Sequence, residues 1–202
     1  GFIGSNLVDY LIKKNHEVSI IDNFSTGKKE NINPKSSVYN IDMSKISYND
    51  KIVNIMSNAD SVFLLAAKAR VQPSIINPLE YEQNNTIGVM NILKCASEAG
   101  VRRVIYSASS SAYGDSKVIP LKETLSVNPL SPYGAQKYYG EILCRMFAQV
   151  YNIETVSLRY FNVYGEKQNI DGAYALVMGI FAHQRLNGEP MTIRGDGEQR
   201  RD

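Results

Sequence analysis

The sequence predicts an α/β fold in which a doubly wound parallel sheet is covered by helices on both faces. Short runs rich in β-branched residues alternate with amphipathic helical patterns along the chain. The strand-like runs are nearly continuous in apolar residues, which is typical of strands buried on both faces. A length of 202 residues fits one domain with a small additional lobe.

The first half of the chain supplies three predicted strands. A helix is expected at 5–15, where Leu7, Val8, Leu11 and Ile12 share one side. Strand 17–22 ends in an acid and is followed by a polar loop at 23–34. Strand 37–41, a short helix at 50–57 and the apolar strand 61–66 come next.

The second half continues the alternation. A long helix is expected at 78–99, because Gly100 provides a suitable C-terminal stop. Strand 103–107 precedes a proline-containing loop at 108–132, and Pro132 introduces a helix at 133–151. The remaining elements are predicted as strand 155–158, helix 173–186 and strand 191–193.

Composition excludes several classes of protein. Apolar residues make up 44% and charged residues 21%, as in soluble globular proteins, and a net charge of +2 favours neither a nucleic-acid nor a membrane partner. The apolar run 62–67 is too short to span a bilayer. Cys95 and Cys144 fall in helical patterns and are expected to be buried, reduced thiols, which fits the cytoplasm. The two histidines stand alone, so no metal site is expected.

The start of the chain has features of a dinucleotide site. Gly1 and Gly4 precede a helix, where backbone N–H groups can approach a pyrophosphate. Asp22 follows Gly4 by eighteen residues and ends the next predicted strand, where an acid accepts hydrogen bonds from an adenosine ribose. The carboxylate would repel a 2′-phosphate, so NAD is expected rather than NADP. The alternative is a helix cap followed by a turn aspartate.

The glycine fingerprint is incomplete, because its first glycine and the strand before it are missing. That strand would lie at the centre of the sheet, between 17–22 and 61–66. Without it, both neighbours would leave backbone groups unpaired, at about 1–3 kcal/mol for each buried group. We therefore expect the 202 residues to be a fragment of a longer chain.

Tyr133 and Lys137 are the most informative pair for chemistry. Residues four apart on a helix share a face, where an ammonium can lower the pKa of a phenol and make tyrosine a usable base. The serine run Ser109–Ser111 lies upstream and could hold the proton of an alcohol. The alternative is a polar turn, a helix-start aromatic residue and a surface lysine.

In this order, these motifs resemble the extended short-chain dehydrogenase/reductases, and most closely their NAD-dependent epimerase/dehydratase branch, typified by UDP-glucose (UDP-galactose or UDP-N-acetylglucosamine) 4-epimerase. The resemblance covers essentially the whole chain and extends to the stretches 22–27, 107–114, 131–137, 159–165 and 195–202. It implies a Rossmann sheet that lacks the first strand and most of the C-terminal substrate lobe. It also implies an NAD-binding domain at 1–160 and the start of a substrate-binding region at 161–202.

The resemblance implies a role for each matching residue. Ser109, Tyr133 and Lys137 would be catalytic. The cofactor would be held by Gly1, Phe2, Ile3, Gly4, Asp22, Asn23, Ser25, Thr26, Gly27, Asp42, Met43, Leu65, Ala66, Ala67, Asn84, Ser107, Tyr133, Lys137, Tyr160 and Phe161. The nucleotide-sugar would contact Ser109, Ser111, Tyr133, Asn162 and Arg201. Arg159 and Tyr113 are expected to support the site rather than react.

The activity that the resemblance implies is NAD-dependent 4-epimerisation of a UDP-hexose through a 4-keto intermediate. Dehydrating relatives need a carboxylate just after the catalytic hydroxyl, and this chain has Ser110 and Ser111 there. Three alternatives stay open: a UDP-glucuronate 4-epimerase or decarboxylase, another nucleotide-sugar enzyme of the superfamily, and an inert dinucleotide-binding fragment or regulator. The helices at 78–99 and 133–151 could also form a homodimer, although their apolar stripes would serve a core equally well.

Overall fold

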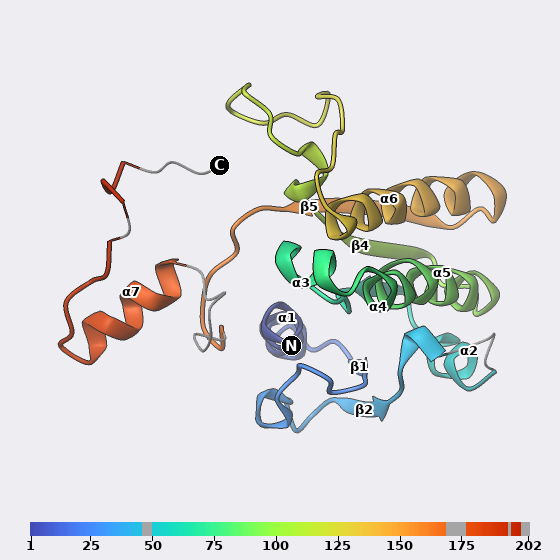
Figure 1. Ribbon diagram of the computed structural model, residues 1–202. Helices are drawn as coiled ribbons and strands as arrows, with labels where there is room; N and C mark the ends of the chain where they lie inside the picture. Colours follow the sequence, from blue (N-terminus) through green and yellow to red (C-terminus); the bar gives the residue numbers. More distant parts are fainter. Residues whose placement is uncertain (46–49, 169–176, 194, 199–202) are drawn as a thin grey trace.

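The computed structural model describes residues 1–45, 50–168, 177–193 and 195–198. Figure 1 shows a body of helices and strands, with helix α7 (Val177–Leu186) lying apart from it.

All strand pairs among the described residues are parallel, which confirms the predicted sheet type. The strands are β1 (Ser19–Asp22), β2 (Ser37–Asn40), β3 (Ser61–Leu64), β4 (Arg103–Ser109) and β5 (Glu154–Tyr160). β1 pairs with β2, and β3, β4 and β5 form a second sheet in that order. No strand of the described residues joins β1 to β3, so the strands form two separate sheets.

The helices agree with the predicted alternation. They are α1 (Phe2–Lys13), α2 (Asp50–Met56), α3 (Val71–Ile76), α4 (Pro78–Glu82), α5 (Gly88–Glu98), α6 (Pro132–Val150) and α7. A π-helical turn at Gln83–Ile87 joins α4 to α5, so the helix predicted at 78–99 is one run with a change of phase inside it. Short 3₁₀ turns lie at Lys29–Asn31, Met43–Lys45 and Ser110–Tyr113.

Several boundaries differ from the predictions. Helix α1 begins at Phe2 rather than residue 5, because the Gly1 carbonyl already accepts the Ser5 N–H at 3.0 Å. The prediction of a strand at 191–193 is wrong: the Thr192 N–H donates to the Gln184 side chain at 3.1 Å, with no strand pairing. Helix α3 was not predicted. Residues 173–176 of the predicted last helix lie outside the described residues.

Strand β4 forms the centre of the core. Val104 and Tyr106 share one face of β4 and are fully buried, whereas Phe63 of β3 and Leu158 of β5 are each 40% exposed. On the other face of β4, Ile105 is only partly buried, while Ser107 and Ser109 are buried. Burial on both faces is therefore correct only for the carboxyl-terminal half of β4 and wrong for its neighbours. Cys95 and Cys144 are buried, free thiols in this core, as predicted.

Gly140 lets α6 lie closely against β4. A Cβ atom built there would be 2.2 Å from the Tyr106 hydroxyl oxygen, so a larger residue would push the helix off the strand. Lys137 lies about one turn before Gly140 and is buried by the same close approach. The packing of α6 on β4 therefore sets the position of the candidate catalytic lysine.

The described residues contain neither a membrane-spanning helix nor a metal-binding cluster. None of the helices there is long and apolar enough to cross a membrane. The same residues contain no group of three side chains able to hold a metal ion.

Candidate active site

Tyr133 and Ser109 meet where β4 ends and α6 begins. Ser109 is the last residue of β4, is 7% exposed, and its side chain is hydrogen-bonded to that of Tyr133. The Ser109 oxygen also accepts the N–H of Ser111 at 3.2 Å, which fixes the turn after the strand. The structure thus brings together two of the three predicted catalytic residues.

The first turn of α6 is held by serine hydroxyls from two segments. Ser131 accepts the Gly134 N–H at 3.1 Å as the N-cap, and Pro132 occupies the start of the helix. Ser74 of α3 is fully buried and accepts the Tyr133 N–H at 3.1 Å. Because both bonds satisfy helix-start donors, the backbone of Tyr133 is fixed relative to α3.

Lys137 is not the surface lysine that the alternative interpretation required. Only 3% of it is exposed, and its Nζ donates to the Ser107 carbonyl at 2.8 Å. The ammonium also lies 5.1 Å from the centre of the Tyr106 ring. Burial lowers the Lys137 pKa to about 8.

The pKa of Tyr133 moves in the opposite direction from the sequence-based expectation. Burial raises the Tyr133 pKa, because it removes water from the phenolate, while the hydrogen bond with Ser109 lowers it. Ser109, rather than Lys137, therefore makes the favourable contribution in the protein alone. The expectation that the Lys137 ammonium lowers this pKa is not supported by the structure.

Ser111 lines a hollow beside these residues. The hollow has a volume of about 210 Å³ and is bordered by the turn after β4, the start of α3 and the segment before α6. Asp115 and Leu130 also line it. This position next to Ser109 suits a residue predicted to contact substrate.

The predicted cofactor residues at the start of the chain converge around Asp22. The Gly1 nitrogen lies 3.5 Å from the Asp22 carboxylate. A Cβ atom at Gly27 would be 3.2 Å from that carboxylate and 3.4 Å from the Gly1 nitrogen. The glycines therefore leave open space around an acid at a helix start, and these residues fit the adenosine and pyrophosphate part of NAD.

The loops after β1 and β2 carry the next group of predicted cofactor residues. Asp22 accepts the Phe24 N–H at 2.8 Å, and Asn23 accepts the Ser25 N–H at 3.0 Å. Thr26 is exposed beside them. Although burial opposes it, hydrogen bonds from Ser44 and Asn23 keep the pKa of Asp42 low, so this carboxylate stays ionised.

Met43 and Asn84 are predicted to hold the cofactor, but their side chains make contacts within the protein. The Met43 side chain is 7% exposed and packs in the core against Gly88. Asn84 donates to the Glu80 carbonyl of its own helix at 2.9 Å. The buried amide is Asn85, at 1% exposure, which bonds both the N–H and the carbonyl of Lys68 at 2.9 Å.

Asn85 therefore holds the loop that follows β3 and contains Leu65, Ala66 and Ala67. Leu65 also approaches α1, because a Cβ atom at Gly4 would lie 3.5 Å from its Cδ1. Sequence reasoning missed Asn85, since the π-helical turn changes which of two adjacent asparagines faces inward. The two adjacent asparagines at 84–85 are the sequence signal that could have indicated this buried amide.

The far side of the site is formed where β5 ends. Tyr160 is the last residue of β5, and Phe161 is 38% exposed, with its ring centre 6.4 Å from that of Tyr113. Asn162 is exposed in the segment that follows. Arg201 lies outside the described residues.

The Ser107 hydroxyl on β4 is buried and has no hydrogen-bond partner among the described residues. The backbone carbonyl of the same residue accepts the hydrogen bond from the Lys137 Nζ.

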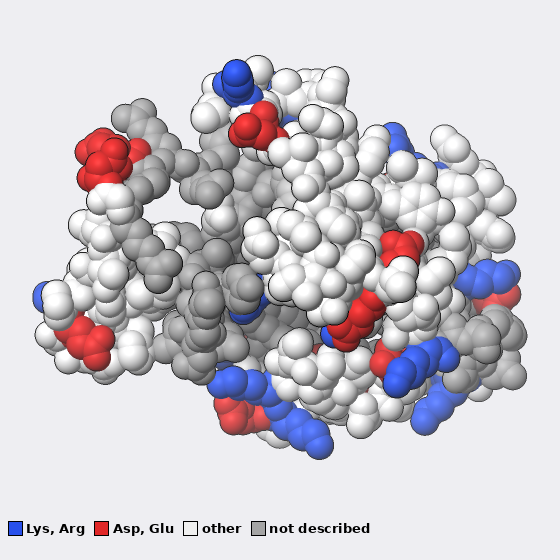
Figure 2. Space-filling view, viewed as in Figure 1, with Lys and Arg blue, Asp and Glu red and all other residues white. Residues whose placement is uncertain are grey.

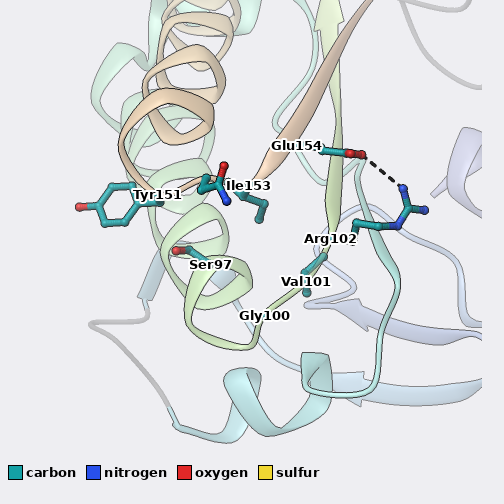
Figure 3. Close-up of a pocket in the computed structure, with 8 residues that line it drawn as sticks. Ser97, Gly100, Val101, Arg102, Tyr151, Ile153 and Glu154 are labelled. Carbon is teal, nitrogen blue, oxygen red and sulfur yellow. Dashed lines mark hydrogen bonds and ion pairs between the residues drawn. The ribbon is translucent and has the colours of Figure 1, made fainter.

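A larger hollow lies elsewhere and contains none of the predicted site residues. It has a volume of about 490 Å³ and is bordered by the ends of α5 and α6 and the beginnings of β4 and β5. Figure 3 shows its side chains, including the ion pair between Arg102 and Glu154. Parallel strands carry their ligands at their carboxyl ends, so we place the active site at Tyr133 instead.

Comparison with known proteins shows the family of the chain. The sequence matches the NAD dependent epimerase/dehydratase family over residues 1–202. The chain belongs to this family. Asp22, Ser109 and Tyr160 end strands of parallel pairs, at the carboxyl edge where sheets of this kind bind their ligands.

Solved structures of nucleotide-sugar epimerases share the fold. A UDP-N-acetylglucosamine 4-epimerase from Methanobrevibacter ruminantium, in complex with UDP-N-acetylmuramic acid, is 40% identical with a TM-score of 0.90. A UDP-glucose 4-epimerase from Thermotoga maritima with UDP-glucose is 39% identical with a TM-score of 0.89. Each match covers 98% of this chain and 64% of the other.

A UDP-glucuronic acid 4-epimerase from Bacillus cereus, solved with UDP-glucuronic acid and NAD, is similar at a lower level. It is 31% identical, with a TM-score of 0.82, over 98% of this chain and 64% of the other. The chain also spans 66% of the length of two curated relatives that it matches throughout. It therefore corresponds to just under two thirds of the length of these two relatives.

Proposed function

We propose that the protein interconverts the C4 epimers of a UDP-hexose with NAD as its cofactor. The observation that carries the proposal is the hydrogen bond between Tyr133 and Ser109, next to a buried Lys137 on the same helix. Similarity to UDP-sugar 4-epimerases over the whole chain supports the substrate class.

Each residue has a defined part in the proposed reaction. Tyr133, as the phenolate, takes the proton of the sugar 4-hydroxyl and becomes the neutral phenol, which returns the proton when the 4-hydroxyl forms again. Ser109 holds that hydroxyl in reach of Tyr133. Lys137 would hold the nicotinamide ribose through its ammonium. When bound, NAD would supply the reversible hydride transfer at the sugar C4.

The turn after Ser109 argues against a dehydratase. Elimination of water from the sugar needs an additional acid or base beside the catalytic hydroxyl. The 3₁₀ turn there begins with Ser110 and Ser111, neither of which is an acid at neutral pH. The residues at hand suit proton and hydride exchange at one carbon.

The test is an epimerisation assay with three substrates. The protein is incubated with NAD and, separately, with UDP-galactose, UDP-N-acetylgalactosamine and UDP-galacturonic acid, and the C4 epimers are separated by chromatography. We expect product from at least one of the two uncharged sugars. If NAD is bound and no C4 epimer forms from any substrate, the proposed activity is wrong.

The uronic sugar represents the second candidate function. The similarity to the Bacillus cereus UDP-glucuronic acid 4-epimerase favours it. Product from UDP-galacturonic acid alone would assign the protein to this activity, and release of carbon dioxide would indicate a decarboxylase. An inert dinucleotide-binding regulator would raise its unfolding midpoint with NAD and turn over none of the sugars.

We further propose that Asp22 binds the adenosine ribose. The side chain is 27% exposed and accepts the Phe24 N–H, so Asp22→Asn keeps a matching acceptor while it removes the charge. Hydrogen bonds to a charged group contribute about 1.5–3 kcal/mol, so we expect NAD affinity to fall about tenfold or more. Calorimetry with NAD and NADP measures this. Asp9→Asn on α1 is the control. An unchanged NAD affinity for Asp22→Asn would show that Asp22 does not bind the adenosine ribose.

A homodimer through α4, α5 and α6 is the proposed assembly. Leu79 of α4 is 84% exposed, and Tyr139 and Ile142 of α6 are 43% and 38% exposed. Ile87, in the π-helical turn between α4 and α5, is 43% exposed. Figure 2 shows a wide uncharged area over α6 and a few acidic side chains near α4. Such a surface suits a second copy of the chain.

A single charge tests this assembly. We expect Leu79→Glu to shift the protein from dimer to monomer in sedimentation experiments, because it places a carboxylate in an apolar contact. Leu186→Glu, at an 86% exposed site on α7, is the matched control. A monomeric unmodified protein, or a dimer unaffected by Leu79→Glu, would exclude this interface. Location in the cytoplasm and a domain division at residue 160 stay predictions.

A further inference from the structure

A buried ion pair outside the predicted site joins three parts of it. Arg159 of β5 donates from Nε and Nη2 to the two carboxylate oxygens of Glu141 on α6, both at 2.8 Å. The Arg159 side chain is 15% exposed and that of Glu141 11%. The planar fork of arginine matches a carboxylate in two bonds, which fixes orientation as well as distance.

The guanidinium also holds the turn that carries the serines. Its carbon lies 4.5 Å from the centre of the Tyr113 ring, within the range of a cation–π contact. Tyr113 ends the 3₁₀ turn that directly follows Ser109. Arg159 itself directly precedes Tyr160 at the end of β5. One side chain thus contacts the catalytic helix and the serine turn from the strand that leads to the predicted nicotinamide site.

We propose that Arg159, Glu141 and Tyr113 form a positioning clamp that sets the distance between Tyr133 and Ser109. This inference rests on the proposed function. Glu141 lies one turn beyond Lys137 and two turns beyond Tyr133 on the same helix, so the clamp fixes α6 on one side. Tyr113 fixes the serine turn on the other.

Stability alone does not explain this arrangement. Replacing a buried ion pair by apolar side chains of similar volume is often neutral or stabilising. The clamp also leaves the Arg159 Nη1 buried without a partner among the described residues, which a stabilising contact would avoid. What the pair adds is a defined geometry between two elements, and here those elements carry the candidate base and its hydrogen-bond partner.

The test replaces the pair by apolar residues and follows Tyr133 in two ways. In Arg159→Met/Glu141→Leu we expect the unfolding midpoint to stay at or above that of the unmodified protein. We expect kcat to fall about 10- to 100-fold, the range for a small misplacement of reacting groups. Arg159→Lys keeps the charge without the fork and should recover kcat only in part.

The second readout does not depend on activity. Tyrosinate absorbance is titrated in the double variant and in the unmodified protein, each compared with its Tyr133→Phe counterpart, which isolates Tyr133. Because the Ser109 bond lowers the Tyr133 pKa, a loosened clamp should raise it further. A control on the same strands, Arg103→Met/Glu154→Leu, removes an ion pair at their opposite ends and should leave Tyr133 unchanged.

The outcomes separate this inference from the proposed function. If the unmodified protein epimerises no sugar, the function fails, while the Tyr133 titration still decides the clamp. A stable apolar double variant with unchanged Tyr133 pKa and, in an active enzyme, unchanged kcat would overturn the clamp. A double variant that unfolds is replaced by Arg159→Lys, for which the same titration shift is expected.

Discussion

Replacing Tyr133 by phenylalanine is expected to remove most of the epimerase activity and to leave NAD bound. The variant loses one hydroxyl, whose partner in the protein is the Ser109 side chain. General-base contributions of this kind are worth about 10²–10⁴-fold in rate, so we expect kcat to fall within that range. The assay is the conversion of the best UDP-sugar at saturating concentration.

The position of Tyr133 explains why NAD binding should survive. Its backbone is held by Ser74, and the fold around it does not depend on the phenol oxygen. The residues predicted at the adenosine ribose, Asp22 and Gly27, belong to β1 and the loop after it rather than to α6. Calorimetry with NAD should therefore give similar affinities for the variant and the unmodified protein.

Tyr138→Phe is the matched control, because it removes a phenol oxygen from the same helix. We expect it to keep the kcat of the unmodified protein. Near-full turnover in Tyr133→Phe would show that another group takes the proton. Loss of NAD together with activity would instead make Tyr133 a cofactor contact.

The local chemistry of this site could be predicted from the sequence, because it depends on short spacings. Tyr133 and Lys137 lie four residues apart on one helix, and Pro132 marks the start of that helix in the structure as predicted. Asp22 ends β1 as the strand pattern indicates. These features follow from periodicity and from residues that begin or end elements.

Tertiary partners could not be predicted, because no spacing encodes them. Glu141 and Arg159 are eighteen residues apart and meet only when β5 packs against α6. The choice between Asn84 and Asn85 depends on a π-helical turn that the apolar pattern does not show. The strand predicted at 191–193 failed for a related reason, since side-chain bonds to Gln184 replace sheet pairing there.

Burial of charge was the most consequential feature that the sequence left open. The sequence does not distinguish a buried lysine on a helix from a surface lysine. Only the contact of α6 with β4 shows that Lys137 is buried. The enclosure explains why its pKa falls while that of Tyr133 rises: burial disfavours the charged form of each. Burial therefore favours the neutral phenol of Tyr133 and the neutral amine of Lys137.

The stability of the protein should therefore depend on pH through Lys137. Its folded pKa is about 8, against 10.5 for an unperturbed lysine. Between these values the unfolded chain binds more protons than the folded one, so the contribution of Lys137 makes the protein more stable as pH rises. Below pH 8 the folded state carries a buried ammonium, at a cost of about 3 kcal/mol by the usual 1.4 kcal/mol for each pKa unit.

Lys137→Met removes this charge and keeps a side chain of similar length. The variant also loses the bond to the Ser107 carbonyl, which offsets part of its gain at every pH. We therefore expect its stability relative to the unmodified protein to fall by about 3 kcal/mol between pH 7 and pH 10.5, as the unmodified protein loses the buried charge. Urea unfolding at a series of pH values measures this difference. Lys117→Met, at an exposed site, should show a difference that is constant with pH. A constant difference for Lys137→Met would mean that the ammonium reaches water in the folded protein, which would contradict its burial against β4.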